Sequence, residues 1–165
     1  MSGDVSDTFR NVEEIISNVL LERYDLGLIN QPVETILADA ESFLFQAQTE
    51  FGAIDHDPAN LLKAIVHYRL ALRRYNQFDP KTLSETLKAL RTEAEDGLKK
   101  AEEKSQSIRN DGKAKINRLR HESEYSEAIR ECDRMMQFFP PGSKEYEDFR
   151  AEKLEIQDKI SKRRD

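Results

Sequence analysis

The sequence is poor in the residues that cross-link or interrupt a chain. It contains one cysteine, five prolines and six glycines among 165 residues. A single thiol, Cys132, excludes a disulfide within the chain and suits a reducing compartment. No histidine stands near Cys132 in the sequence, which disfavours a reactive nucleophile at this position. The scarcity of proline and glycine favours long amphipathic helices.

Long hydrophobic runs are also missing. No apolar segment approaches the roughly 18–20 residues that a membrane span requires. Residues 1–7 lack the basic and apolar regions of a signal peptide. We therefore expect a soluble, cytoplasmic chain without a membrane span. The formal net charge of −6 argues against nucleic acid as the partner.

The motifs that carry common chemistry are absent. The sequence has no phosphate-binding loop, no nucleophile elbow and no cysteine and histidine spacing typical of zinc. Asp55-His56-Asp57 is a weak metal motif, because Asp57 occupies an N-cap position and no further ligands follow at helical spacing. His67, beside Tyr68, is interpreted as a half-buried packing residue. We expect no enzymatic activity, no metal and no cofactor.

What the sequence does have is helical periodicity. Hydrophobic residues make up 38% of the chain and charged residues 35%, and no segment alternates as a strand does. The clearest segment runs from Asp57 to Pro80. Its apolar residues recur at helical spacing: Leu61, Ala64, Ile65, Tyr68, Ala71, Leu72 and Tyr75. A second stripe of Leu62, Val66 and Leu70 predicts burial on more than one side of this helix.

The pattern predicts a single all-α domain over residues 1–165. Its elements are an N-terminal helix at 8–27, a helical hairpin at 32–78, a long central helix at 80–121, a helix at 125–139 and a C-terminal capping helix at 143–162. Asn110-Asp111-Gly112 is a turn signal inside the long helix. The helix either runs through this point or breaks near Asp111, and we favour a continuous or kinked helix because the apolar stripe resumes in register.

Two segments, NLLKAIVHYRLALRRYNQFDP and SEYSEAIRECDRMMQFFPPGSKEY, resemble the second helix of a tetratricopeptide repeat. That repeat is a helix–turn–helix of about 34 residues with small residues where its helices touch. Residues that match its pattern are Phe51, Gly52, Leu61, Ala64, Tyr68 and Ala71 in one unit and Leu119, Tyr125, Ala128 and Pro140 in the other. The pattern is broken at Ile116, Cys132 and Met135, and the separation of Ala64 from Ala128 is not a whole number of repeats.

The resemblance implies antiparallel hairpins in a tetratricopeptide-like solenoid or bundle that offers an interaction surface. Lys113 and Asn117 fall where peptide-binding members of that family hold the lysine and asparagine that grip a terminal carboxylate. Arg120 and His121 face the same groove in that register. These four residues are the candidate partner-binding residues, and ordinary exposure on a solvated helix face is the competing interpretation.

Two functions follow from these observations. The first hypothesis is a non-catalytic adaptor or scaffold that binds a protein or peptide partner beside its helix pairs. The alternative is a structural subunit of a larger assembly, with the helix at 80–121 as an oligomerisation arm, in a homo- or hetero-oligomer. The surroundings of the charged segment at 102–107 in that helix distinguish the two hypotheses. A solvated arm favours assembly, and a helix packed against its neighbours favours the groove.

Overall fold

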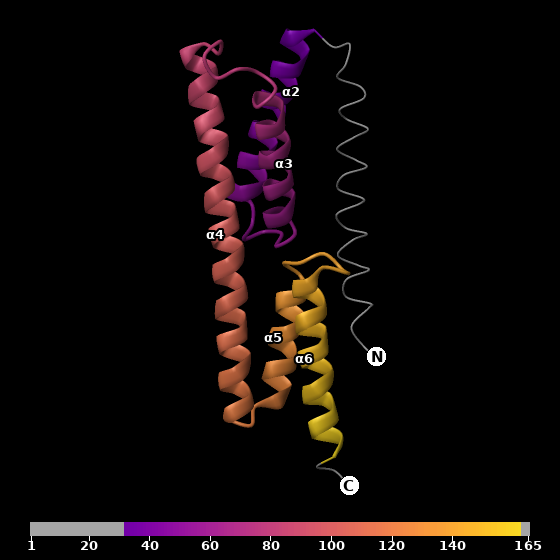
Figure 1. Cartoon of the computed structure of the whole chain (residues 1–165). Helices are drawn as coiled ribbons and strands as arrows, with labels where there is room; N and C mark the ends of the chain where they lie inside the picture. Colours follow the sequence, from indigo (N-terminus) through magenta and orange to yellow (C-terminus); the bar gives the residue numbers. More distant parts are fainter. Residues whose placement is uncertain (1–31, 163–165) are drawn as a thin grey trace. The chain divides into compact units, whose positions relative to one another are not determined.

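The computed structural model describes residues 32–162, so the helix predicted at 8–27 lies outside the described residues. All regular structure in the described range is α-helical, which confirms the all-α prediction there. The five helices are α2 (Val33–Gly52), α3 (Asn60–Tyr75), α4 (Glu85–His121), α5 (Tyr125–Met136) and α6 (Lys144–Ser161) (Figure 1). None of them is long and apolar enough to cross a membrane.

The chain divides into two compact units between Lys104 and Ser105. Among the described residues, the N-terminal unit (residues 32–104) holds α2, α3 and the first part of α4. The C-terminal unit (residues 105–162) holds the rest of α4 together with α5 and α6. Each of these units has a core of its own, and the single domain that the sequence pattern predicted stays a prediction.

The start of α4 differs from the prediction, since the helix begins at Glu85 and not at Pro80. Local hydrogen bonds hold the intervening residues in a turn. The Asp79 carboxylate accepts a bond from the Lys81 amide at 2.9 Å, and the Ser84 hydroxyl accepts one from the Leu87 amide at 3.3 Å. Ser84 therefore supplies the cap that the sequence placed earlier.

Side-chain hydrogen bonds also occur near the starts of α3 and α6. Asp57 accepts a bond from the Ala59 amide at 3.0 Å, but it precedes α3 by a turn, because that helix begins at Asn60. Ser143 caps α6 as predicted, accepting a bond from the Tyr146 amide at 3.2 Å. Helix α5 ends at Met136, three residues short of the predicted 139, and α4 includes the turn signal at 110–112 without interruption.

Alanines at seven-residue spacing form the centre of the N-terminal unit. One pair lies on each helix, and all six side chains are 0% exposed: Ala40 and Ala47, Ala64 and Ala71, Ala94 and Ala101. Small side chains at contacts let helix backbones approach closely. Larger residues of α3, Leu61, Tyr68 and Tyr75, follow at the same spacing and are also buried.

The second apolar stripe of α3 is less buried than its pattern predicted. Val66 is 52% exposed, and Leu62 and Leu70 are only half-buried. Helix α3 is thus buried on one broad face, and the prediction of burial on more than one side is wrong for Val66. Isolated apolar side chains of this kind are common on protein surfaces.

Gly97 allows α3 and α4 to pack closely. A Cβ atom at Gly97 would lie 2.3 Å from Cε1 of Tyr68, whose ring is 3% exposed. Gly112 serves the C-terminal unit in the same way, since a Cβ atom there would lie 2.0 Å from Sδ of the buried Met135. Glycine is needed at these two positions because neighbouring side chains approach the backbone closely, and not because the backbone conformation requires it.

Aromatic and sulfur-containing side chains form the core of the C-terminal unit. Phe149 of α6 is 0% exposed, and its ring stacks on Phe139 with centroids 6.0 Å apart. Cys132 of α5 is fully buried. Burial, together with the negative charges of Glu152 and Asp133, raises the pKa of its thiol to about 12. The thiol is therefore protonated at neutral pH and acts as a packing group.

Candidate functional site

The predicted partner-binding residues lie on the part of α4 that belongs to the C-terminal unit. Lys113 and Arg120 face α6, whose acidic side chains meet them. Lys113 lies 3.5 Å from Asp148, and Arg120 lies 3.1 Å from Glu152 and 2.6 Å from Glu155. Asn117 and His121 are exposed.

The acidic side of α6 matches this basic face along several turns. Arg109 of α4 lies 3.5 Å from Glu145 and 3.6 Å from Asp148. Four of the six acids of α6 therefore form one helical row, at spacings of three, four and three residues: Glu145, Asp148, Glu152 and Glu155. Burial alone would lower the pKa of Arg120, but Glu152 and Glu155 raise it, so its guanidinium stays charged. A partner at this face has to compete with α6, and the role of these residues in binding stays a prediction.

A second charged cluster joins α4 to α5 around a buried carboxylate. Glu131 is 4% exposed and accepts hydrogen bonds from Lys115 Nζ at 2.8 Å and from Arg134 Nη2 at 2.5 Å. Burial by itself would raise the pKa of Glu131, but the hydrogen bonds and charges of Arg134 and Lys115 outweigh it and hold that pKa below its usual range. The cluster is structural, because both cations are used to hold one carboxylate between two helices.

We expect the contribution of Glu131 to stability to depend on pH. A carboxyl whose folded pKa lies below the unfolded value of about 4.3 stabilises the fold above that value, and the effect is lost as the pH falls through the folded pKa. At pH 7, Glu131→Gln should lower the free energy of unfolding by about 1 kcal/mol, since both cations are half-exposed. The difference from the parent chain should shrink towards zero below pH about 4.

Urea unfolding of both proteins across this pH range measures the effect. The matched control is Glu127→Gln, which removes an exposed ion pair with Arg130 on the same helix. The control should change stability by less than about 0.5 kcal/mol. A Glu131→Gln deficit of the same size at pH 7 and at pH 3 would contradict this account of the cluster.

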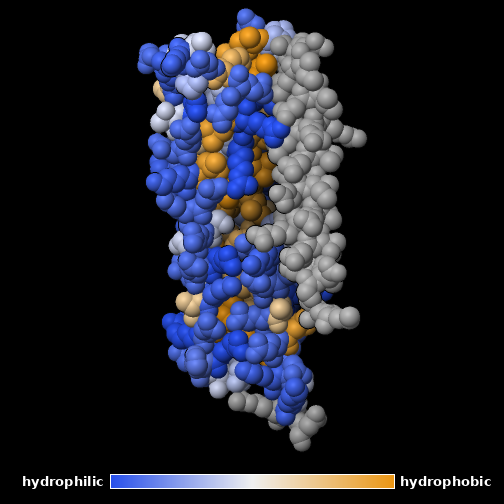
Figure 2. Space-filling view, in the orientation of Figure 1, coloured by the Kyte–Doolittle hydropathy of each residue, from blue (hydrophilic) through white to orange (hydrophobic). Residues whose placement is uncertain are grey.

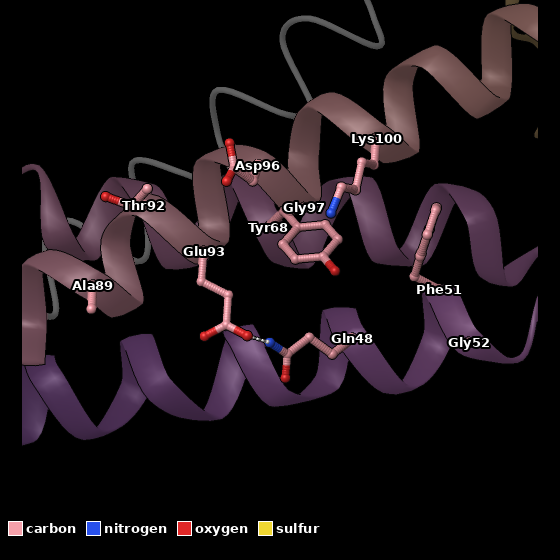
Figure 3. A pocket seen from close by; sticks show the side chains of 10 residues that line it. All are labelled: Gln48, Phe51, Gly52, Tyr68, Ala89, Thr92, Glu93, Asp96, Gly97 and Lys100. Atoms are coloured by element: carbon pink, nitrogen blue, oxygen red, sulfur yellow. Dashed lines mark hydrogen bonds between the residues drawn. The ribbon is translucent and has the colours of Figure 1, made fainter.

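The N-terminal unit has a groove between α2 and α4 that the sequence did not predict. A hollow of about 660 Å³ is lined by Gln48 and Phe51 of α2, by Tyr68 of α3, and by α4 residues that include Glu93, Gly97 and Lys100. Figure 3 shows the Tyr68 ring against Gly97, with the Lys100 side chain reaching down beside it. Gln48 Nε2 donates a hydrogen bond to Glu93 Oε1 at 2.8 Å.

A second hollow continues the first on the other side of this hydrogen bond. It measures about 410 Å³ and shares Gln48 and Glu93 with its neighbour. Its other lining residues include Glu41, Phe45 and Leu90. We call the two hollows together the α2–α4 groove. Figure 2 shows orange, hydrophobic side chains between blue ones in the upper part of the view, where the N-terminal unit lies.

Sequence reasoning missed the groove for a physical reason. Its polar residues, Gln48, Glu93 and Lys100, fall on exposed helix faces, where charged residues are ordinary. The one signal that could have pointed to it was Gly97, a glycine inside a predicted helix, which often marks close packing. His67, by contrast, is half-buried as predicted, hydrogen-bonded to Glu50 at 2.6 Å and stacked on Phe43.

In residues 32–162, no group of three or more histidine, cysteine, aspartate or glutamate side chains is placed to hold a metal ion. Comparisons with protein-family models, with curated proteins and with solved structures find no match for the chain. The function is therefore argued from the geometry of the two units alone.

Proposed function

We propose that this chain is a non-catalytic interaction module, tetratricopeptide-like in its helix packing, that binds a protein or peptide partner. The observation that carries the proposal is the construction of the N-terminal unit. Helices α2, α3 and α4 each bury two alanines at seven-residue spacing, and residues of α2 and α4 line a groove of two adjoining hollows. Grooves between packed helices are common docking sites for partner segments.

The packing of α4 favours this proposal over an oligomerisation arm. Within the N-terminal unit, Glu93 and Glu102 of α4 bond to Gln48 of α2 and Arg69 of α3. Within the C-terminal unit, Lys115 bonds to Glu131 of α5 and Arg120 to α6. Both parts of α4 thus contact neighbours in their own units, whereas an arm exposes its whole length to solvent or to other subunits. The charged segment at 102–107 is exposed except at Ser105, and this is the feature that favours the structural-subunit alternative.

Affinity capture of the intact chain, followed by mass spectrometry and sedimentation analysis, tests the proposal. We expect a partner to co-purify in a fixed stoichiometry and to form a defined complex with the purified chain. Self-association into a defined oligomer, with no other protein in the complex, would support the structural-subunit alternative. A captured protein is accepted as a partner only if it also binds the purified chain directly.

The same partner tests the residues that the sequence singled out. If the face of α4 takes the partner, removing Lys113 and Arg120 together should weaken binding at least tenfold, because charge-assisted hydrogen bonds contribute about 1.5–3 kcal/mol each. The loss should shrink at high salt, which screens exposed charges. Titration calorimetry of the double alanine variant measures it.

The matched control is Arg118→Ala, an exposed cation on the same helix. It should leave the affinity within about twofold, because its side chain lies off the Lys113 and Arg120 face. The double variant also loses the ion pairs with Asp148, Glu152 and Glu155, so its melting curve should shift slightly while the fold persists. Unchanged affinity in a folded double variant would exclude this face.

A further inference from the structure

The charge of the α2–α4 groove is predominantly negative. Three carboxylates line its two hollows, those of Glu41, Glu93 and Asp96, against one ammonium group, that of Lys100. Glu93 gives one oxygen to Gln48, and its second oxygen remains available to accept a bond. A cationic group entering the groove would therefore meet complementary charge.

An almost buried polar side chain reaches the groove independently of these acids. Tyr68 is 3% exposed and lines the larger hollow, and its hydroxyl makes no hydrogen bond to any other described residue. Glycine at position 97 gives the ring the space it occupies. The hydroxyl oxygen is not one of the fully buried, unpaired polar atoms of the described residues, so it is accessible from the hollow and can form a hydrogen bond with a polar group of a ligand.

The smaller hollow adds an apolar anchor point. Phe45 is 70% exposed, and Leu44 and Leu90 line the same hollow beside it. Exposed aromatic rings beside a hollow are common at interfaces, because they bury much area with little loss of side-chain freedom. An apolar side chain of a ligand would remove this ring from water.

We propose that the α2–α4 groove binds an amphipathic helix of a partner protein, one that carries a lysine or arginine between apolar side chains. This inference rests on the proposed interaction function and names its site and the chemistry of its partner. Phe45 and Leu90 receive the first apolar side chain. The cationic side chain bonds to Glu93, and a polar group of the partner bonds to the Tyr68 hydroxyl.

The length of the groove fixes the length of the partner segment. Its α2 residues run from Glu41 to Gly52, which corresponds to about 16 Å of helix at 1.5 Å per residue. A docked helix of about three turns covers that distance. Its contact side chains then recur at three- and four-residue steps, with the cation at the centre, opposite the bond between Gln48 and Glu93.

A phage-displayed library of 16-residue helical peptides, randomised on one face, tests the inference without a known partner. Selection on the intact chain should enrich peptides that combine lysine or arginine with apolar residues at those steps. Glu93→Gln should weaken the enriched peptides at least tenfold, and Ala89→Trp, which fills the larger hollow, should abolish their binding. Glu103→Gln, an exposed acid on the same helix outside the groove, is the matched control and should change affinity less than twofold.

Each other outcome overturns the inference. Enrichment of acidic or purely apolar peptides refutes the stated chemistry, and no enrichment refutes the groove as a helix-binding site. Peptides that bind Ala89→Trp and the parent chain equally, but fail on the variant lacking Lys113 and Arg120, place the site on the C-terminal unit. That last result leaves the proposed function standing and removes only the groove. If the peptides inhibit self-association of the chain, the occupant of the α2–α4 groove is a second copy of the chain and not a partner protein.

Discussion

Replacing Phe149 by alanine is expected to lower the free energy of unfolding of the C-terminal unit by about 3–5 kcal/mol. The ring is fully buried and stacks on Phe139, so its removal leaves a cavity in addition to the lost burial of apolar surface. For a unit of this size a loss of that magnitude is a large part of the total stability. We expect the variant to be unfolded or molten in this unit at 37 °C.

Leu154→Ala is the matched control for this prediction. Leu154 lies on the same helix, but its side chain is 57% exposed. Its removal should cost less than about 1 kcal/mol, because little surface is withdrawn from water at that position. Urea denaturation followed by circular dichroism measures both variants. Similar midpoints for the two would mean that Phe149 is not at the core of the unit.

The second large effect is expected from overpacking at two alanines. Ala64 of α3 and Ala128 of α5 are both 0% exposed, one in each unit. Leucine at either position inserts three carbon atoms into a close-packed contact and should cost about 1–3 kcal/mol. The same positions carry the tetratricopeptide resemblance, so the result also bears on the repeat register.

Thermal melts of Ala64→Leu and Ala128→Leu measure this effect, with Ala38→Leu and Ala114→Leu as controls. The control alanines lie on exposed faces of α2 and α4, where leucine has room and a similar helix propensity. Both controls should melt within about 2 °C of the parent chain. If all four variants melt alike, the alanines are not at helix contacts and the predicted repeat register is wrong.

Periodicity in the sequence was enough to predict the helices but not their neighbours. The stripe through Leu61, Tyr68 and Tyr75 predicted α3, and the hydroxyl of Ser143 predicted the start of α6, because both signals are local. The start of α4 was predicted too early, because Pro80 is a favourable first residue and the side-chain bonds of Asp79 and Ser84 that hold the turn carry no periodic signal.

Charged residues were the harder part of the prediction for the candidate sites. Glu131 looks exposed by residue type, and its burial depends on Lys115, which comes from another helix. Lys113 and Arg120 were selected through the resemblance, and nothing in that pattern requires an acidic row on α6 to meet them. Long-range ion pairs depend on how helices pack, which spacing within one helix does not determine.

The buried thiol of Cys132 allows the opening of the C-terminal unit to be measured by chemical labelling. The chain has one cysteine, and a maleimide or disulfide reagent reaches it only while the unit is open. When reagent is abundant, the labelling rate equals the rate of opening, and when reagent is scarce it reports the fraction of time spent open. A partner that binds only the closed unit would therefore slow the labelling of an unmodified chain, so that binding can be followed without attaching a probe.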